Sequence, residues 1–144
     1  MSMSKLKVLF VCTGNSVRSQ MAEALLKHFG GDKFEVYSAG TSPAYVHPNT
    51  IQVMDEIGIS MEGHRSKHIS EVEQIDFDYV ILLCEVAATS CAHLKSKKGT
   101  LTWFIEDPIR VIGPEERKLT AFRITRDILK NKILEFIKSL EEKQ

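Results

Sequence analysis

The sequence has no excess of charge, because 19 lysines and arginines balance 19 aspartates and glutamates and leave a formal net charge of zero. Proteins that bind nucleic acid through their overall charge carry a broad basic surface, which this composition does not supply. The chain also has no acidic tail. Its partners must therefore be inferred from local sites, and we expect no nucleic acid among them.

Long apolar runs are absent too. No run approaches the ~18 residues that a membrane-spanning helix needs, and residues 1–5 are too polar and too short to resemble the start of a signal peptide. We therefore expect a soluble, cytoplasmic protein without a membrane partner. Repeats, low-complexity tracts and linkers are missing as well, so the length predicts a single domain over residues 1–144.

Cysteines are few, and their number is odd. Three cysteines without a secretory signal do not describe a static disulfide framework, so reactive thiols are favoured. No Cys-x-x-Cys pair and no His/Cys pair has the spacing of zinc ligands. We expect neither a metal nor any other cofactor.

Strand-like and helix-like segments alternate along the chain. Apolar segments rich in β-branched and aromatic residues predict strands over 5–11, 34–39, 77–84 and 100–105. Helical spacing and termination signals predict helices over 18–29, 48–57, 85–95 and 116–141. This alternation predicts a parallel sheet with right-handed crossovers, which is a three-layer α/β sandwich.

Each longer predicted helix carries a stripe that should face the core. In the first, the stripe is Met21, Ala24, Leu25, His28 and Phe29, and in the second it includes Ile51 and Met54. The last helix places Leu119, Phe122, Arg126, Leu129, Ile133, Phe136, Ile137 and Leu140 on one side. Arg126 is the one charged residue in that stripe.

The segment Cys12-Thr-Gly-Asn-Ser-Val-Arg-Ser19 joins the first strand to the first helix. Gly14 and Asn15 suit the left-handed backbone region, which lets successive N–H groups converge on one anion. The helix N-terminus adds partial positive charge, and the Arg18 guanidinium matches a tetrahedral oxyanion. The predicted oxyanion-binding residues are Thr13, Gly14, Asn15, Ser16, Val17 and Arg18.

A cysteine in this electropositive setting should be largely thiolate at neutral pH, which makes Cys12 a nucleophile facing a bound anion. The alternative is a buried structural cysteine at the end of a strand. Gly, Asn, Ser and Arg residues serve anion binding better than packing, so we favour the nucleophile.

Cys12-x5-Arg18-Ser19, followed by Met21-Ala22-Glu23-Ala24-Leu25, resembles the signature of the low-molecular-weight protein tyrosine phosphatases and of the thioredoxin-coupled arsenate reductases built on the same fold. The resemblance implies a four-stranded parallel sheet in the order 2-1-3-4. It also implies that Glu23 steadies the loop through Asn15 or Ser38. In some of these reductases a potassium ion lies near the loop, but Lys67 stands here where that site would want a carboxylate.

Asp107, before Pro108, would be the general acid in either family. An Asp-Pro pair also commonly begins a turn, which is the alternative interpretation. We expect His64 to be structural rather than catalytic, holding a loop through a side-chain hydrogen bond.

Other residues discriminate between the two chemistries. Cys84 and Cys91 reproduce the Cys-x6-Cys spacing of the reductases, and Gln20 follows their pattern where the phosphatases usually carry proline. Phosphatases of this fold generally have aromatic residues after the Asp-Pro pair, whereas this chain has Ile109 and Arg110. The alternative explanation is that Cys84 and Cys91 are two apolar cysteines that have this spacing by coincidence.

The resemblance implies a complete reaction. Cys12 attacks arsenate, Ser19 stabilises its thiolate and Asp107 protonates the departing water. Cys84 then attacks the sulfur of Cys12 and arsenite leaves, after which Cys91 displaces Cys12 and thioredoxin reduces the Cys84–Cys91 disulfide. Some phosphatase activity should remain, because arsenate and phosphate are similar in shape and charge.

Two alternatives to this reductase stay open. One is a low-molecular-weight protein tyrosine phosphatase that forms a phosphocysteine on Cys12. The other is a non-enzymatic sensor of phosphate or phosphopeptides.

The spacing of the second cysteine pair also predicts motion. On a regular helix seven residues span roughly 10.5 Å, whereas a disulfide tolerates about 7 Å between α-carbons. The helix predicted over 85–95, anchored mainly by Val86 and Leu94, must therefore unwind before Cys84 and Cys91 can bond.

Overall fold

Four parallel strands form the centre of the structure, a computed structural model that describes residues 4–142. The strands β1 (Leu6–Cys12), β2 (Phe34–Gly40), β3 (Phe77–Leu82) and β4 (Ser96–Thr102) lie in the order β2-β1-β3-β4. This is the order that the family resemblance implied. Residues 1–3 and 143–144 of the predicted 1–144 domain lie outside the described residues.

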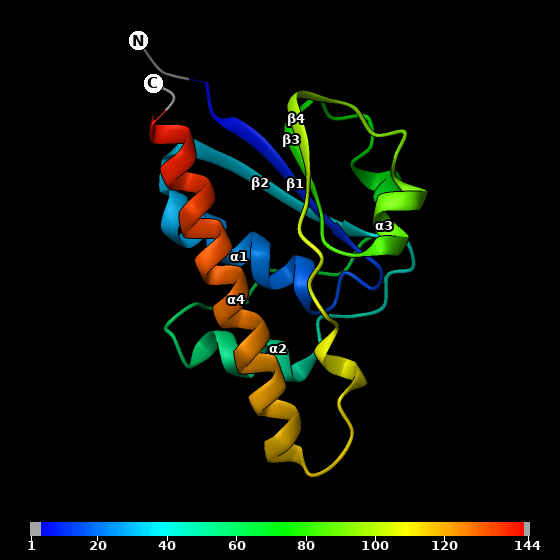
Figure 1. Cartoon of the computed structure of the whole chain (residues 1–144), viewed down its shortest axis with the longest axis vertical. Helices are drawn as coiled ribbons and strands as arrows, with labels where there is room; N and C mark the ends of the chain where they lie inside the picture. Colours follow the sequence, from blue (N-terminus) through cyan, green and yellow to red (C-terminus); the bar gives the residue numbers. More distant parts are fainter. Residues whose placement is uncertain (1–3, 143–144) are drawn as a thin grey trace.

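Helices cover both faces of the sheet (Figure 1). One face carries α1 (Arg18–Gly30), α2 (Pro48–Asp55) and the long α4 (Glu115–Glu142), and the other carries the short α3 (Glu85–Ser90). Three single-turn 3₁₀ helices complete the chain: η1 (Gly31–Lys33), η2 (Ile69–Glu71) and η3 (Pro108–Arg110).

The central strand β1 is buried on both faces. Val8 and Phe10 pack into the larger apolar cluster with α1, α2 and α4, whereas Leu9 and Val11 pack into a smaller cluster that includes residues of α3. Alternate residues of a strand point to opposite faces, so the continuous apolar run of β1 supplies both clusters. The predicted three-layer α/β sandwich is confirmed.

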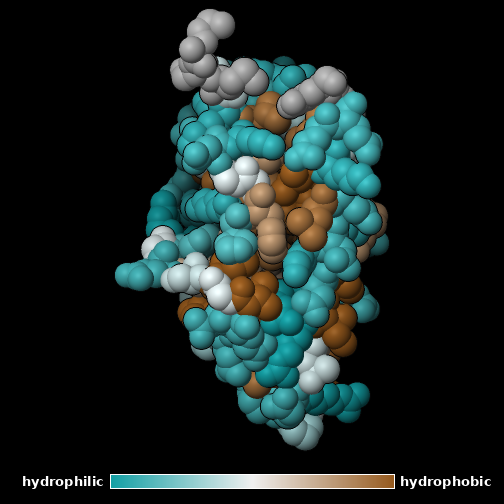
Figure 2. Space-filling model, turned by 90° about the vertical axis from the view of Figure 1, so that its left-hand side faces the viewer, coloured by the Kyte–Doolittle hydropathy of each residue, from teal (hydrophilic) through white to brown (hydrophobic). Residues whose placement is uncertain are grey.

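The predicted stripe of α4 is confirmed, and its charged member has a partner. Arg126 donates from Nη1 to the carbonyl of Val53 at 2.8 Å and to Glu56 Oε1 at 3.0 Å, which ties α4 to α2. The side of the molecule shown in Figure 2 is mostly hydrophilic, with hydrophobic residues gathered in a central strip.

Three predicted inward positions are wrong. His28 and Phe29 are exposed near the end of α1, and the helix instead buries Ala22 and Leu26 between the sheet and α4. Ile51 is 46% exposed. In its place α2 buries Thr50, which donates to the carbonyl of Ser16 at 3.1 Å and so supports the loop after β1.

Some predicted boundaries are also wrong. The helix expected over 85–95 ends at Ser90, and its expected anchor Val86 is 51% exposed. The fourth strand runs over Ser96–Thr102 rather than 100–105. It begins with the polar residues Ser-Lys-Lys-Gly, which an edge strand accommodates because one of its sides faces solvent.

Candidate active site

The loop between β1 and α1 begins at Cys12, the last residue of the strand, and ends at Arg18, the first residue of the helix. Asn15 has φ of 47°, and it is the one non-glycine residue of the described chain with a positive φ. Gly14, for which we expected the same region, does not have a positive φ. The left-handed turn falls on Asn15 because its side chain is anchored there by buried hydrogen bonds.

Cys12 is buried, with 2% of its surface exposed. Its sulfur lies 2.9 Å from the hydroxyl oxygen of Ser19. That oxygen accepts a hydrogen bond from Nδ2 of Asn15 at 2.7 Å, which leaves the hydroxyl proton of Ser19 free to point at the sulfur. The loop therefore offers the sulfur of Cys12 a donor, the contact that we expected of Ser19.

Arg18 connects the loop to the segment that follows β4. Its Nη1 donates to the carbonyl of Ile105 at 3.0 Å, and its Nη2 lies 3.4 Å from Oδ2 of Asp107. Residues 89 positions apart in sequence thus meet at one site. Oδ1 of Asp107 also accepts from the backbone N–H of Ile109 at 3.1 Å, so this carboxylate both begins a turn and faces the loop.

Cys84 opens onto the same site. It is the N-cap of α3, where its sulfur accepts from the N–H of Ala87 at 3.4 Å and lies 3.5 Å from the hydroxyl of Thr13. A cavity of about 520 Å³ lies over these groups. It is lined by Thr13, Arg18, Cys84, Glu85, Val86, Phe104, Ile105, Glu106, Asp107 and Arg110.

Cys91 lies at the other end of α3, as its C-cap, and is 2% exposed. It packs in the smaller apolar cluster. Burial, with smaller contributions from Cys84 and Glu73, raises the pKa of Cys91 and favours its protonated thiol. All three cysteines are free thiols, and the folded α3 separates the second from the third.

A network of buried polar side chains lies behind the loop. The hydroxyl of Ser38 donates to Glu23 Oε1, and Nδ2 of Asn15 donates to Ser38 at 3.0 Å, so the expected support of the loop by Glu23 is present. His64 holds this region through its Nδ1, 3.2 Å from Gln20 Oε1, as expected of a structural histidine. Burial lowers the pKa of His64, although Glu23 opposes the shift.

Two residues of this region escaped the sequence analysis as contributors to the site. The sequence analysis used Gln20 only as a residue that follows the reductase pattern. In the structure its side chain is fully buried beneath the loop. Gly40 ends β2, and a Cβ there would lie 2.5 Å from the carbonyl oxygen of Thr13 and 2.9 Å from the nitrogen of Asn15. The sequence signal that could have identified Gly40 is a glycine at the carboxyl end of a strand that lies beside the loop.

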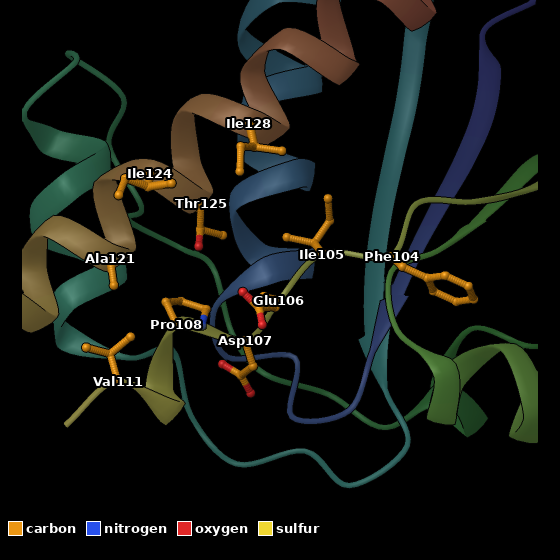
Figure 3. Close-up of a pocket in the computed structure, with 10 residues that line it drawn as sticks. All are labelled: Phe104, Ile105, Glu106, Asp107, Pro108, Val111, Ala121, Ile124, Thr125 and Ile128. Carbon is orange, nitrogen blue, oxygen red and sulfur yellow. The ribbon is translucent and has the colours of Figure 1, made fainter.

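An apolar cavity of about 440 Å³ adjoins the site (Figure 3). It lies between the segment that carries Asp107 and the side of α4 that presents Ile124 and Ile128.

Within residues 4–142, no three His, Cys, Asp or Glu side chains are placed to hold a metal ion. The same residues contain no helix that could cross a membrane. Lys67 directs its Nζ to the carbonyl of Arg65 at 3.1 Å.

Comparison with known proteins gives the class of this fold and site. Residues 7–144 match the family described as low molecular weight phosphotyrosine protein phosphatase. The chain belongs to that family, and the curated relatives to which it is similar include arsenate reductases.

Among those relatives, the arsenate reductase of Halalkalibacterium halodurans is 40% identical over 93% of this chain and 96% of its own. The arsenate reductase of Bacillus subtilis is 38% identical over 90% and 93%. A glutaredoxin arsenate reductase of Synechocystis is 35% identical over 88% and 92%.

Solved structures include both chemistries. An arsenate reductase in its oxidised state is 34% identical, with a TM-score of 0.80 over 92% of this chain and 97% of that one. An arginine phosphatase of Geobacillus stearothermophilus is 28% identical, with a TM-score of 0.78 over 96% and 95%. A thioredoxin-dependent arsenate reductase of Corynebacterium glutamicum is 27% identical, with a TM-score of 0.73 over 100% and 66%.

Proposed function

We propose that this protein reduces arsenate to arsenite through a relay of Cys12, Cys84 and Cys91. The observation that carries the proposal is the position of Cys84, which lines the cavity over the anion loop with its sulfur 3.5 Å from the hydroxyl of Thr13, while Cys91 lies at the far end of the same short helix. A phosphatase needs the loop, Arg18 and Asp107, but it has no use for a second thiol at the cavity.

In the first step the arsenate oxyanion lies in the loop against the backbone N–H groups and Arg18. The Cys12 thiolate attacks arsenic, an As–O bond breaks, and the oxygen leaves as water with a proton from Asp107. Ser19 supplies a hydrogen bond to the thiolate before the attack. The product is a covalent thiol-arsenate in which arsenic is still pentavalent.

In the second step the Cys84 thiolate attacks the sulfur of Cys12. The S–As bond breaks and its electron pair stays on arsenic, which leaves as trivalent arsenite, and a Cys12–Cys84 disulfide forms. The Cys91 thiolate then attacks the sulfur of Cys84 and releases Cys12. In the cytoplasm a thioredoxin would reduce the resulting Cys84–Cys91 disulfide and restore the three thiols.

Steady-state kinetics test this function and its reductant together. Arsenate should be consumed with oxidation of NADPH when thioredoxin and thioredoxin reductase are present, with glutathione and glutaredoxin as the parallel arm. Turnover only in the parallel arm would overturn the thioredoxin assignment. Absence of turnover in both arms, with rapid hydrolysis of phosphotyrosine, would make the protein a phosphatase.

Phosphatase activity is the second candidate function, because Cys12, Arg18 and Asp107 are the groups that it requires. Phe104, which lines the cavity and is 63% exposed, and Tyr45, which is 61% exposed, are the aromatic side chains that could line the path of an aryl phosphate. Ile109 and Arg110 supply no such wall. We therefore expect slow hydrolysis of an aryl phosphate as a side activity of the reductase.

A further inference from the structure

Gln20 lies in the centre of the polar network behind the anion loop. Its side chain is fully buried, and all of its polar atoms have partners. Nε2 lies 3.1 Å from both the carbonyl oxygen and Oδ1 of Asn15, and 3.0 Å from the carbonyl oxygen of Arg65. Oε1 lies 3.2 Å from Nδ1 of His64. One side chain thus joins the loop to the segment around residues 64–67.

These contacts fix the orientation of the Asn15 amide. Oδ1 of Asn15 accepts from Gln20 and from the backbone N–H of Lys67, the latter at 2.9 Å. Nδ2 of Asn15 must then face the opposite way, where it donates to Ser19 and Ser38. Gln20 also bonds the carbonyl of the same residue, whose backbone holds the unfavourable φ of 47°.

The orientation of Asn15 in turn decides what Ser19 can do. A hydroxyl group has one proton, and the oxygen of Ser19 already accepts from Asn15. When Cys12 is a thiolate its sulfur can only accept, so the proton of Ser19 is directed at that sulfur, 2.9 Å away. A continuous chain of hydrogen bonds runs from Gln20 through Asn15 and Ser19 to the nucleophile.

We propose that Gln20 is a positioning residue that holds the anion loop in its binding shape before the anion arrives and directs the Ser19 hydroxyl at Cys12. The inference rests on the proposed function for the identity of the nucleophile, but it does not depend on arsenate as the substrate. It predicts two separable effects of Gln20, one on anion affinity and one on the reactivity of Cys12.

The first experiment compares Gln20→Met with Gln52→Met, the same change at an exposed glutamine of α2. The rate of alkylation of Cys12 by iodoacetamide at neutral pH is measured by mass spectrometry, and protection by inorganic phosphate gives the phosphate affinity. Gln20→Met should weaken phosphate binding about tenfold or more, because buried acceptors lose their donor, and should slow the alkylation. Gln52→Met should match the wild type.

Repeating the measurement in the Ser19→Ala variant separates an effect of Gln20 through Ser19 from a general disturbance of the structure. In Ser19→Ala the link to Cys12 is cut, so adding Gln20→Met should still weaken phosphate binding but should not slow alkylation further. Equal slowing in both backgrounds would show that Gln20 does not act through Ser19.

If Gln20→Met does not fold, His64→Leu removes one bond to Gln20 and should give the same two effects, more weakly. A folded variant with wild-type phosphate affinity and alkylation rate would overturn the proposal. Arsenate turnover does not enter either measurement, so failure of the reductase proposal would be recognised separately.

Discussion

The two regions that meet at the cavity are built in opposite ways. In the anion loop and the first turn of α1, Cys12, Asn15, Ser19 and Gln20 are at most 2% exposed, and their polar groups bond one another. In residues 84–95, by contrast, only Ala87 and Cys91 are buried. The anion loop, which we call the rigid region, suits anion binding and nucleophile activation, because both need fixed donors. Residues 84–95, which we call the loose region, suit a relay in which a thiol must move.

The largest expected effect separates the two regions by chemistry. Cys12→Ser should lower both arsenate turnover and aryl phosphate hydrolysis by on the order of a thousandfold or more, because both reactions need the nucleophile. Cys84→Ser should abolish arsenate turnover alone, since hydrolysis uses water as the second nucleophile. Both activities are measured on each variant with the same protein preparation. Aryl phosphate hydrolysis that survives Cys12→Ser would show that the nucleophile is misassigned.

The next effect tests the rigidity of the anion loop. Gly40→Ala places a methyl group 2.5 Å from the carbonyl oxygen of Thr13, so the loop must shift, at a cost of about 1–3 kcal/mol. Gly14→Ala is the matched change inside the loop, where the added carbon meets only Cβ of Ser16 at an ordinary 3.6 Å. Calorimetric titration with phosphate should show a much larger loss of affinity for Gly40→Ala. The reverse order would mean that close approach of β2 does not shape the loop.

A smaller and more local effect concerns the loose region. Seven residues on a helix separate α-carbons by roughly 10.5 Å, so a Cys84–Cys91 disulfide requires α3 to unwind. Oxidation should therefore reduce the protection of residues 85–95 from hydrogen exchange, while the anion loop stays protected. Exchange is measured on both redox forms, with the bond verified by mass spectrometry. Equal protection of 85–95 in the two forms would remove the unwinding step from the mechanism.

The smallest expected effect is the response of the buried network to acid. Burial lowers the pKa of His64, so the unfolded chain binds its proton more readily than the folded protein. The associated stability is present above the ordinary histidine pKa of about 6.5 and is lost as the pH falls through the lower folded value. Urea unfolding between pH 7 and pH 5 should show a shallower loss for His64→Gln than for the wild type. His28→Gln, at an exposed histidine of α1, is the control and should keep the wild-type slope.

Sequence patterns predicted the positions of strands and helices best where burial along the element is uniform. The strand at β1 and the long stripe of α4 carry continuous or strictly periodic apolar residues, so their positions follow directly. The edge strand β4 and the short α3 were displaced or shortened, because solvent-facing residues carry little periodic signal. In the site, Cys12, Arg18 and Ser19 are close in sequence and were identified together, and the contact between Cys12 and Ser19 could be anticipated. Gly40 and Gln20 were not assigned their places, because each acts by approaching residues that only folding brings near.

The sequence by itself determined the chemical content of this protein: a thiol in a turn rich in anion-binding residues, two further thiols seven positions apart, and an Asp-Pro pair. Local chain geometry is enough for these, since they depend on residue type and spacing. The tertiary structure alone decided that Asp107 meets Arg18, that Cys84 contacts Thr13 at the cavity, and that the left-handed residue is Asn15 rather than Gly14. The physical reason is that contacts between distant segments depend on strand order and close packing, and the conformation of a single loop residue depends on the buried hydrogen bonds that surround it.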